Sequence, residues 1–125
     1  MMSRKIAVVE DNPDNRMLVQ ALLEDRYEIS EYETGAQAVE GLGSDVPDLI
    51  LLDISLPEMD GTEVLAWIRG QDALKDLPVI ALTAHAMAGD RDKYIAAGFD
   101  DYVTKPIVDE AVLIEAIERC LSATG

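Results

Sequence analysis

Five stretches with the hydrophobic pattern of β-strands are spaced along the chain. Residues 49–52 (LILL) and 79–84 (VIALTA) are apolar almost throughout, which is typical of strands buried on both faces of a sheet. Residues 5–9 (KIAVV) form a short run rich in β-branched positions, and residues 27–33 (YEISEYE) alternate as a half-exposed edge strand does. Residues 102–104 (YVT) are the last predicted strand.

The stretch between the first two strands predicts an amphipathic helix. Asn12 is a helix-capping residue type, and Pro13 suits the first turn of a helix because its missing N–H has no partner there anyway. The spacing of apolar residues predicts that the buried face of this helix consists of four side chains, Met17, Leu18, Ala21 and Leu22.

A helix is also predicted after each of the other strands. The second covers residues 34–42 and ends at Gly43, and the fourth covers residues 86–97 and ends at Gly98. The third is capped by Asp60 and the fifth by Asp109. The predicted core-facing residues are Val64, Leu65 and Ile68 in the third helix and Leu113, Ile117 and Leu121 in the fifth.

Strand and helix therefore alternate five times within 125 residues, a length typical of one domain spanning residues 1–125. Continuous apolar strands joined by helices predict a parallel sheet covered on both faces. The expected fold is α/β, a doubly wound, flavodoxin-like (βα)5 arrangement with strand order 2-1-3-4-5.

Charge, cysteine content and the lack of long apolar stretches bear on the binding partners and the cellular location of the protein. The 25 acidic and 10 basic residues give a net charge of -15, which repels nucleic acid phosphates and anionic lipid surfaces. The single cysteine, Cys120, has no partner for an internal disulfide. We therefore expect it to be a small packing residue in a protein of a reducing compartment. Since no stretch resembles a signal peptide or approaches the roughly 18 apolar residues of a membrane span, a cytoplasmic protein without membrane contact is expected.

Polar side chains stand at the carboxyl ends of the predicted strands. Glu10 and Asp11 follow the first strand, Asp53 ends the third, Thr83 lies at the end of the fourth, and Lys105 follows the fifth. The functional crevice of an open parallel sheet lies at this edge, where the winding direction switches. We therefore expect these side chains to converge.

The residue types at this edge suit phosphoryl transfer. Clustered carboxylates raise one another's pKa unless they share a cation, and oxygen ligands without histidine or cysteine favour Mg²⁺. A carboxylate such as Asp53 can also act as a nucleophile and form an aspartyl phosphate. A lysine and a hydroxyl, available here as Lys105 and Thr83, can neutralise and orient the phosphoryl oxygens.

Four segments together resemble one known family. They are VVEDNPDN (8–15), LILLDISLPEMDG (49–61), VIALTA (79–84) and DDYVTKP (100–106). In this order and spacing the chain resembles the CheY-like receiver domain of two-component response regulators. The EDNP start and the TAHAM segment are more similar to stand-alone DivK-type regulators and to receivers of hybrid kinases than to receivers of transcription factors. With no output domain after Gly125, a stand-alone, single-domain regulator is expected.

The resemblance implies a role for each residue of the metal site. Asp53 would be the phosphoacceptor and a Mg²⁺ ligand, with Asp11 as a direct ligand and Glu10 acting through water. The backbone carbonyl of Ser55 would complete the protein ligands. The acidic pair is Glu-Asp where Asp-Asp is commoner in the family, and both pairs occur.

The resemblance also implies a switch and two partners. Thr83 would be the switch hydroxyl, Lys105 would pair with the phosphoryl group, and Tyr102 would turn inward as Thr83 moves. The Lys105-Pro106 bond would be cis. A histidine kinase or a histidine phosphotransfer protein would donate the phosphoryl group, and a downstream protein would bind the face made by the fourth helix, fifth strand and fifth helix.

Two further predictions concern the rim of the site and the kinase contact. His85 is predicted to lie at the rim of the site and to tune the lifetime of the aspartyl phosphate. Asn15, Arg16 and Val19 on the first helix are predicted to contact the kinase, following the docking mode of the family.

Three other readings of the sequence remain. MDGT (59–62) is superficially similar to the signature of haloacid-dehalogenase-type phosphatases, which would make the chain a small aspartyl-phosphate phosphatase, but no second Asp precedes it at the required position. A flavodoxin-like FMN protein shares the topology, but the loop EDNPDN lacks the Ser, Thr and Gly residues that cradle a phosphate. A pseudo-receiver that docks independently of phosphorylation stays open.

Overall fold

The computed structural model describes residues 4–56, 59, 61–84, 90–105 and 110–124, and in this part of the chain strands and helices alternate. The first elements are β1 (Lys5–Val9), α1 (Pro13–Leu23), β2 (Glu28–Tyr32), α2 (Gly35–Leu42), β3 (Leu49–Asp53) and α3 (Gly61–Arg69). They are followed by β4 (Val79–Thr83), α4 (Asp90–Ala97), β5 (Asp101–Thr104) and α5 (Glu110–Thr124). Each predicted strand is confirmed, and each predicted helix is present within the described residues.

The strands form a parallel sheet in the order β2-β1-β3-β4-β5, as predicted. Val9 at the end of β1 pairs with Leu52, and Asp53 at the end of β3 pairs with Leu82. Because all strands run in one direction, their carboxyl ends lie at the same edge. The winding direction reverses between β1 and β3, beside Asp53, and open α/β sheets bind their ligands at such a point.

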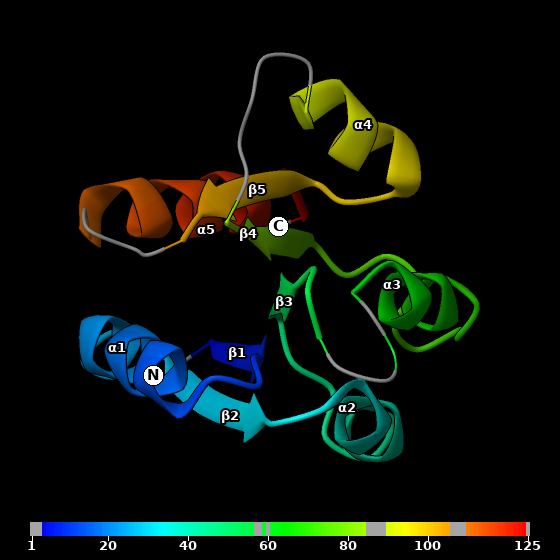
Figure 1. Ribbon diagram of the computed structural model, residues 1–125, viewed down its shortest axis with the longest axis horizontal. Helices are drawn as coiled ribbons and strands as arrows, with labels where there is room; N and C mark the ends of the chain where they lie inside the picture. Colours follow the sequence, from blue (N-terminus) through cyan, green and yellow to red (C-terminus); the bar gives the residue numbers. More distant parts are fainter. Residues whose placement is uncertain (1–3, 57–58, 60, 85–89, 106–109, 125) are drawn as a thin grey trace.

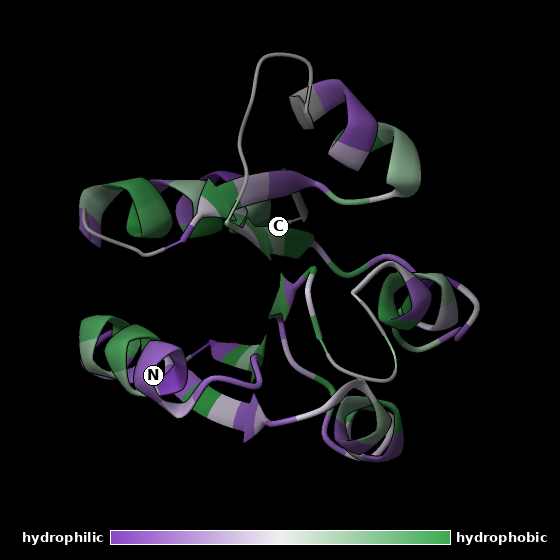
Figure 2. Ribbon diagram, in the orientation of Figure 1, coloured by the Kyte–Doolittle hydropathy of each residue, from purple (hydrophilic) through white to green (hydrophobic). Residues whose placement is uncertain are grey.

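Helices cover both faces of the sheet, with α1 and α5 on one side and α2 and α3 on the other (Figure 1). The side chains of β3 alternate between the two cores: Leu49 and Leu51 pack with α1 and α5, and Ile50 and Leu52 pack with α2 and α3. This alternation explains why residues 49–52 are apolar at every position, since burying each such side chain stabilises the fold by about 1.5–3 kcal/mol. The first half of α4 is hydrophilic (Figure 2).

The predicted apolar face of α1 is wrong in two of its four residues. Met17 is 68% exposed and Ala21 is exposed, whereas Leu18 and Leu22 are partly buried. The buried centre of the helix is Val19 with Leu23. Residues two positions apart lie about 200° apart around a helix, so a helix that buries Val19 turns Met17 and Ala21 toward solvent.

The helix ends follow their local sequence. Asn12 Oδ1 accepts hydrogen bonds from the backbone N–H groups of Asp14 at 2.8 Å and Asn15 at 3.3 Å, which confirms the predicted cap. Gly98 ends α4 with a φ of 115°, a conformation that side-chain-bearing residues rarely adopt. Gly43 ends α2 in the ordinary right-handed region instead.

Some of the predicted helix caps and helical residues lie outside the part of the chain that the structure describes. The caps Asp60 and Asp109 and residues 86–89 of the predicted fourth helix lie outside the described residues. Within the described part, Cys120 is buried, and burial raises the pKa of its thiol to about 11, as expected of a packing residue. None of the described helices has both the length and the apolar character needed to cross a membrane.

Candidate functional site

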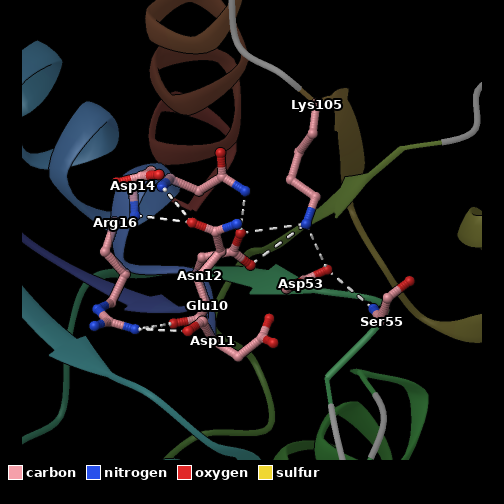
Figure 3. Close-up of polar contacts among 9 residues, drawn as sticks. Glu10, Asp11, Asn12, Asp14, Arg16, Asp53, Ser55 and Lys105 are labelled. Atoms are coloured by element: carbon pink, nitrogen blue, oxygen red, sulfur yellow. Dashed lines mark hydrogen bonds and ion pairs between the residues drawn. The ribbon is translucent and has the colours of Figure 1, made fainter.

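Three carboxylates meet at the carboxyl edge of the sheet, where β1 and β3 end side by side. Glu10 and Asp11 directly follow β1, and Asp53 is the last residue of β3. One oxygen of each lies within 4.8 Å of the others, and Figure 3 shows the three side chains gathered in one place. Glu10 and Asp53 are buried at 0% and 1% exposure, while Asp11 is exposed.

Lys105 reaches the same carboxylates from the end of β5 (Figure 3). Its Nζ lies 3.0 Å from Asp53 Oδ1 and 3.3 Å from Glu10 Oε1, and its backbone N–H donates to the Thr83 carbonyl. Burial acts to lower the pKa of Lys105, but hydrogen bonds and charge interactions with Asp53 and Glu10 outweigh it and raise that pKa. The ammonium group is therefore charged at the centre of the site.

Burial acts to raise the pKa of both Glu10 and Asp53, but the net shifts of the two carboxyl groups are opposite. Burial raises the pKa of Glu10 to about 7, and a proton shared with Asp53 adds to the shift, while Asn15 and Lys105 act against it. Burial also acts to raise the pKa of Asp53, but contacts with Glu10, the Ser55 N–H and Lys105 outweigh it and hold that pKa below its usual value. The arrangement keeps Asp53 ionised, as a nucleophile must be.

The donor set fits a hard divalent cation. Asp53 Oδ1 accepts a hydrogen bond from the Ser55 N–H at 2.9 Å, but its buried Oδ2 has no hydrogen-bond partner among the described residues. An unpartnered buried carboxylate oxygen is costly unless a cation or a new bond engages it. Glu10, Asp11 and Asp53 together offer the carboxylate oxygen ligands that Mg²⁺ prefers.

Comparison with known protein families shows to which family this chain, with its carboxylates and lysine at the edge of the sheet, belongs. Residues 6–118 match the model of the response regulator receiver domain. The chain belongs to the receiver domain family. Receiver domains are signalling modules of two-component systems, so the prediction drawn from the four motifs is confirmed.

Curated relatives of this receiver are of two kinds. The polar-differentiation response regulator DivK of Brucella anthropi is 41% identical over 107 residues, which cover 85% of this chain and 87% of DivK. The histidine-protein kinase BarA of Escherichia coli (strain K12) is 45% identical over 84% of this chain. The sensor protein GacS of Pseudomonas syringae pv. syringae is 43% identical over 82% of this chain. The chain spans only 12% of the length of BarA and GacS.

Solved structures support the same fold. The receiver domain of a sensor histidine kinase from Pseudomonas aeruginosa PAO1 superposes with a TM-score of 0.87 at 36% identity, covering 97% of this chain and 99% of that one. That protein coordinates a magnesium ion in its active-site cleft. Chemotaxis protein CheY4 of Vibrio cholerae also gives a TM-score of 0.87, at 25% identity and with 95% and 99% coverage.

The structure also describes three further residues of the predicted site, Thr83, Tyr102 and Ser55. Thr83 is 3% exposed and ends β4, one residue beyond the pairing partner of Asp53. Tyr102 on β5 is half-buried, and Ser55 is exposed with its N–H bound to Asp53. The metal role of the Ser55 carbonyl stays a prediction, and His85 and Pro106 lie outside the described residues.

Two residues predicted to face the kinase turn out to support the acidic site. Asn15 Nδ2 donates to Glu10 Oε1 at 2.6 Å. Arg16 Nη1 donates to the backbone carbonyls of Glu10 at 2.8 Å and Asp11 at 3.1 Å (Figure 3). Val19 is 1% exposed, so its predicted kinase contact is wrong. The sequence signal that could have revealed this supporting role is position, because Asn15 and Arg16 lie in the first turn of the helix that follows the acidic pair.

Proposed function

We propose that this receiver is a phosphorylation switch that accepts a phosphoryl group on Asp53. The donor is a phosphohistidine of a histidine kinase or of a histidine phosphotransfer protein. One observation carries the proposal: Asp53 is a buried, ionised carboxylate whose Oδ1 is held by Ser55 and Lys105, while its Oδ2 is not engaged by any described hydrogen-bond donor.

The Asp53 carboxylate attacks the phosphorus atom of the phosphohistidine. An O–P bond forms as the P–N bond breaks, and the imidazole nitrogen leaves with the electron pair of that bond. Lys105, already 3.0 Å from Asp53 Oδ1, then contacts a phosphoryl oxygen and offsets its charge. The chain catalyses only this transfer and the later hydrolysis of its own aspartyl phosphate.

Glu10, Asp11, Asp53 and the backbone carbonyl of Ser55 are the proposed Mg²⁺ site, with Asp11 as a direct ligand and Glu10 acting through water. When bound there, Mg²⁺ would neutralise the negative charge that builds up on the phosphoryl oxygens during transfer. The proposal is supported by the 4.8 Å carboxylate cluster and by the bound magnesium ion of the related Pseudomonas aeruginosa receiver. Arg16 and Asn15 hold the acidic loop in position.

The output is a change of protein affinity. An added charge of about -1.5 to -2 at Asp53 draws the hydroxyl of Thr83 and the ammonium of Lys105 toward the phosphoryl group, and Tyr102 turns inward. The face formed by α4, β5 and α5 then binds a downstream protein. No nucleic acid partner is proposed, because a net charge of -15 repels phosphate groups. The proposed location is the cytoplasm, where an unpaired cysteine stays reduced.

Intact-mass spectrometry after incubation with acetyl phosphate tests the proposal. The wild type is expected to gain one phosphoryl group with Mg²⁺ and none with EDTA, whereas Asp53→Asn gains none in either buffer. Asp72→Asn, which alters an exposed acid in the turn after α3, is the matched control and should behave as the wild type. An unmodified wild type in Mg²⁺ would refute the switch and favour a docking module that works without phosphorylation.

A further inference from the structure

Among the described side chains of helix α4, one aromatic residue is buried against the rest of the fold. Among the α4 side chains that the structure describes, at residues 92–97, Tyr94 is buried at 7% exposure and the others are exposed. The helix lies beside β5, away from α1 and α2 (Figure 1), and its first half is hydrophilic (Figure 2). The side chains at residues 92–97 therefore make few apolar contacts with the rest of the fold, as is typical of elements that move in switching.

The ring of Tyr94 sits between two other aromatic rings. Its centroid lies 6.1 Å from that of Phe99 in an edge-to-face arrangement of 88°, and 5.6 Å from that of Tyr102 in a tilted arrangement of 46°. Both spacings are in the range of favourable aromatic pairs. The ring thus joins α4 to Tyr102, the aromatic residue of the proposed switch.

The hydroxyl of Tyr94 makes a second link, to the switch hydroxyl itself. It lies 3.0 Å from Thr83 Oγ1 in a buried hydrogen bond in which either oxygen is able to donate. We propose that Tyr94 is a positioning residue that couples the Thr83 hydroxyl directly to α4, an inference that rests on the proposed phosphorylation of Asp53. Any displacement of Thr83 is then passed to the helix through one side chain.

The hydrogen-bonding capacity of the two hydroxyls gives the coupling a direction. The oxygens of a phosphoryl group at neutral pH are acceptors, so Thr83 must use its one proton to bind them. Tyr94 keeps its bond to Thr83 Oγ1 only by donating its own proton and following the oxygen. Phosphorylation therefore fixes which hydroxyl donates and moves the buried anchor of α4.

Tyr94→Phe removes the hydroxyl and keeps the ring contacts with Phe99 and Tyr102. Tyr27→Phe is the matched control, because Tyr27 packs at the opposite core beside α1 and α5. Each protein is treated with acetyl phosphate and Mg²⁺, the phosphorylated fraction is measured by intact mass, and backbone amide shifts are recorded by NMR.

The wild type and Tyr27→Phe are expected to show phosphorylation-dependent shifts both near Asp53 and along residues 92–97. Tyr94→Phe should reach the same phosphorylated fraction and the same shifts near Asp53, with shifts at residues 92–97 reduced to less than half. Equal shifts at residues 92–97 in Tyr94→Phe and the wild type would overturn the coupling while leaving phosphorylation intact.

A measurement on the wild type makes the test independent of how well the variant folds. The ¹³Cζ resonance of Tyr94 is expected to move on phosphorylation because its hydroxyl, which is able to donate or accept before, is then restricted to donating and follows the displaced Thr83 oxygen. An unchanged resonance would overturn the inference. A wild type that gains no phosphoryl group would overturn the proposed function, and the coupling with it, and is recognised by mass alone.

Discussion

Replacing Glu10 with glutamine removes a buried charge while nearly preserving the shape of the side chain. Glu10 is fully buried, and its pKa lies at about 7, compared with an ordinary value of 4.5. The amide oxygen of glutamine still accepts the hydrogen bond that Asn15 Nδ2 donates, so the substitution acts mainly on charge. The metal-free protein should therefore become more stable above neutral pH.

The magnitude follows from the pKa difference. Each pKa unit corresponds to about 1.4 kcal/mol, so ionised Glu10 destabilises the metal-free folded state by at most about 3 kcal/mol at pH 8. The lost attraction to Lys105 is already contained in that pKa. We expect Glu10→Gln to raise the free energy of unfolding by about 1–3 kcal/mol at pH 8 and by less than about 1 kcal/mol at pH 5.

The sign of the pH dependence is fixed by proton binding. Between pH 4.5 and about 7 the folded wild type binds more protons at Glu10 than the unfolded chain does, so its stability falls as pH rises through this window. Asp53, whose pKa is lowered, contributes in the opposite sense, but only as pH falls toward and below its ordinary value of 3.8. Glu10 therefore dominates the window.

Urea unfolding in EDTA at pH 5 and pH 8 measures the effect. Glu40→Gln, which alters an exposed acid on α2, is the control and should not reproduce it. Millimolar Mg²⁺ at pH 8 should reverse the order, since binding to the folded state stabilises the wild type more than a variant that lacks one carboxylate. The reasoning is refuted if wild type and Glu10→Gln are equally stable at pH 8 in EDTA.

Two further substitutions test how the site is built. Gly61→Ala places a methyl group against the backbone of Asp53 and Ile54, so it should cost about 1–3 kcal/mol in urea unfolding and slow phosphorylation of Asp53; unchanged values would contradict this close approach. Arg69→Met removes hydrogen bonds to the carbonyls of Lys75, Leu77 and Gly98 and to the Asp100 carboxylate. It should cost about 2–4 kcal/mol yet leave phosphorylation unchanged, because these bonds lie at the opposite edge of the sheet, and a slower phosphorylation rate would contradict that separation.

The sequence by itself determined the kind of sheet and the placement of the reactive carboxylate. The apolar run at residues 49–52 has to be buried on both faces, which requires helices on both sides of a parallel sheet. Asp53 ends that run, so it must emerge at the carboxyl edge together with Glu10 and Lys105. These conclusions need only local periodicity and the direction of the strands, and local patterns carry both.

Only the tertiary structure decided what each side chain touches. Periodicity did not distinguish the buried Glu10 from the exposed Asp11, and it assigned Met17 to the core because a one-residue shift in the helical face changes the pattern little. Arg16 turned toward the acidic loop, a contact for which its position in the first turn of α1 was the one sequence signal. Tyr94 reached Thr83, a contact that leaves no trace in the neighbouring residues. Such contacts depend on where separate elements pack, and packing is a property of the whole chain.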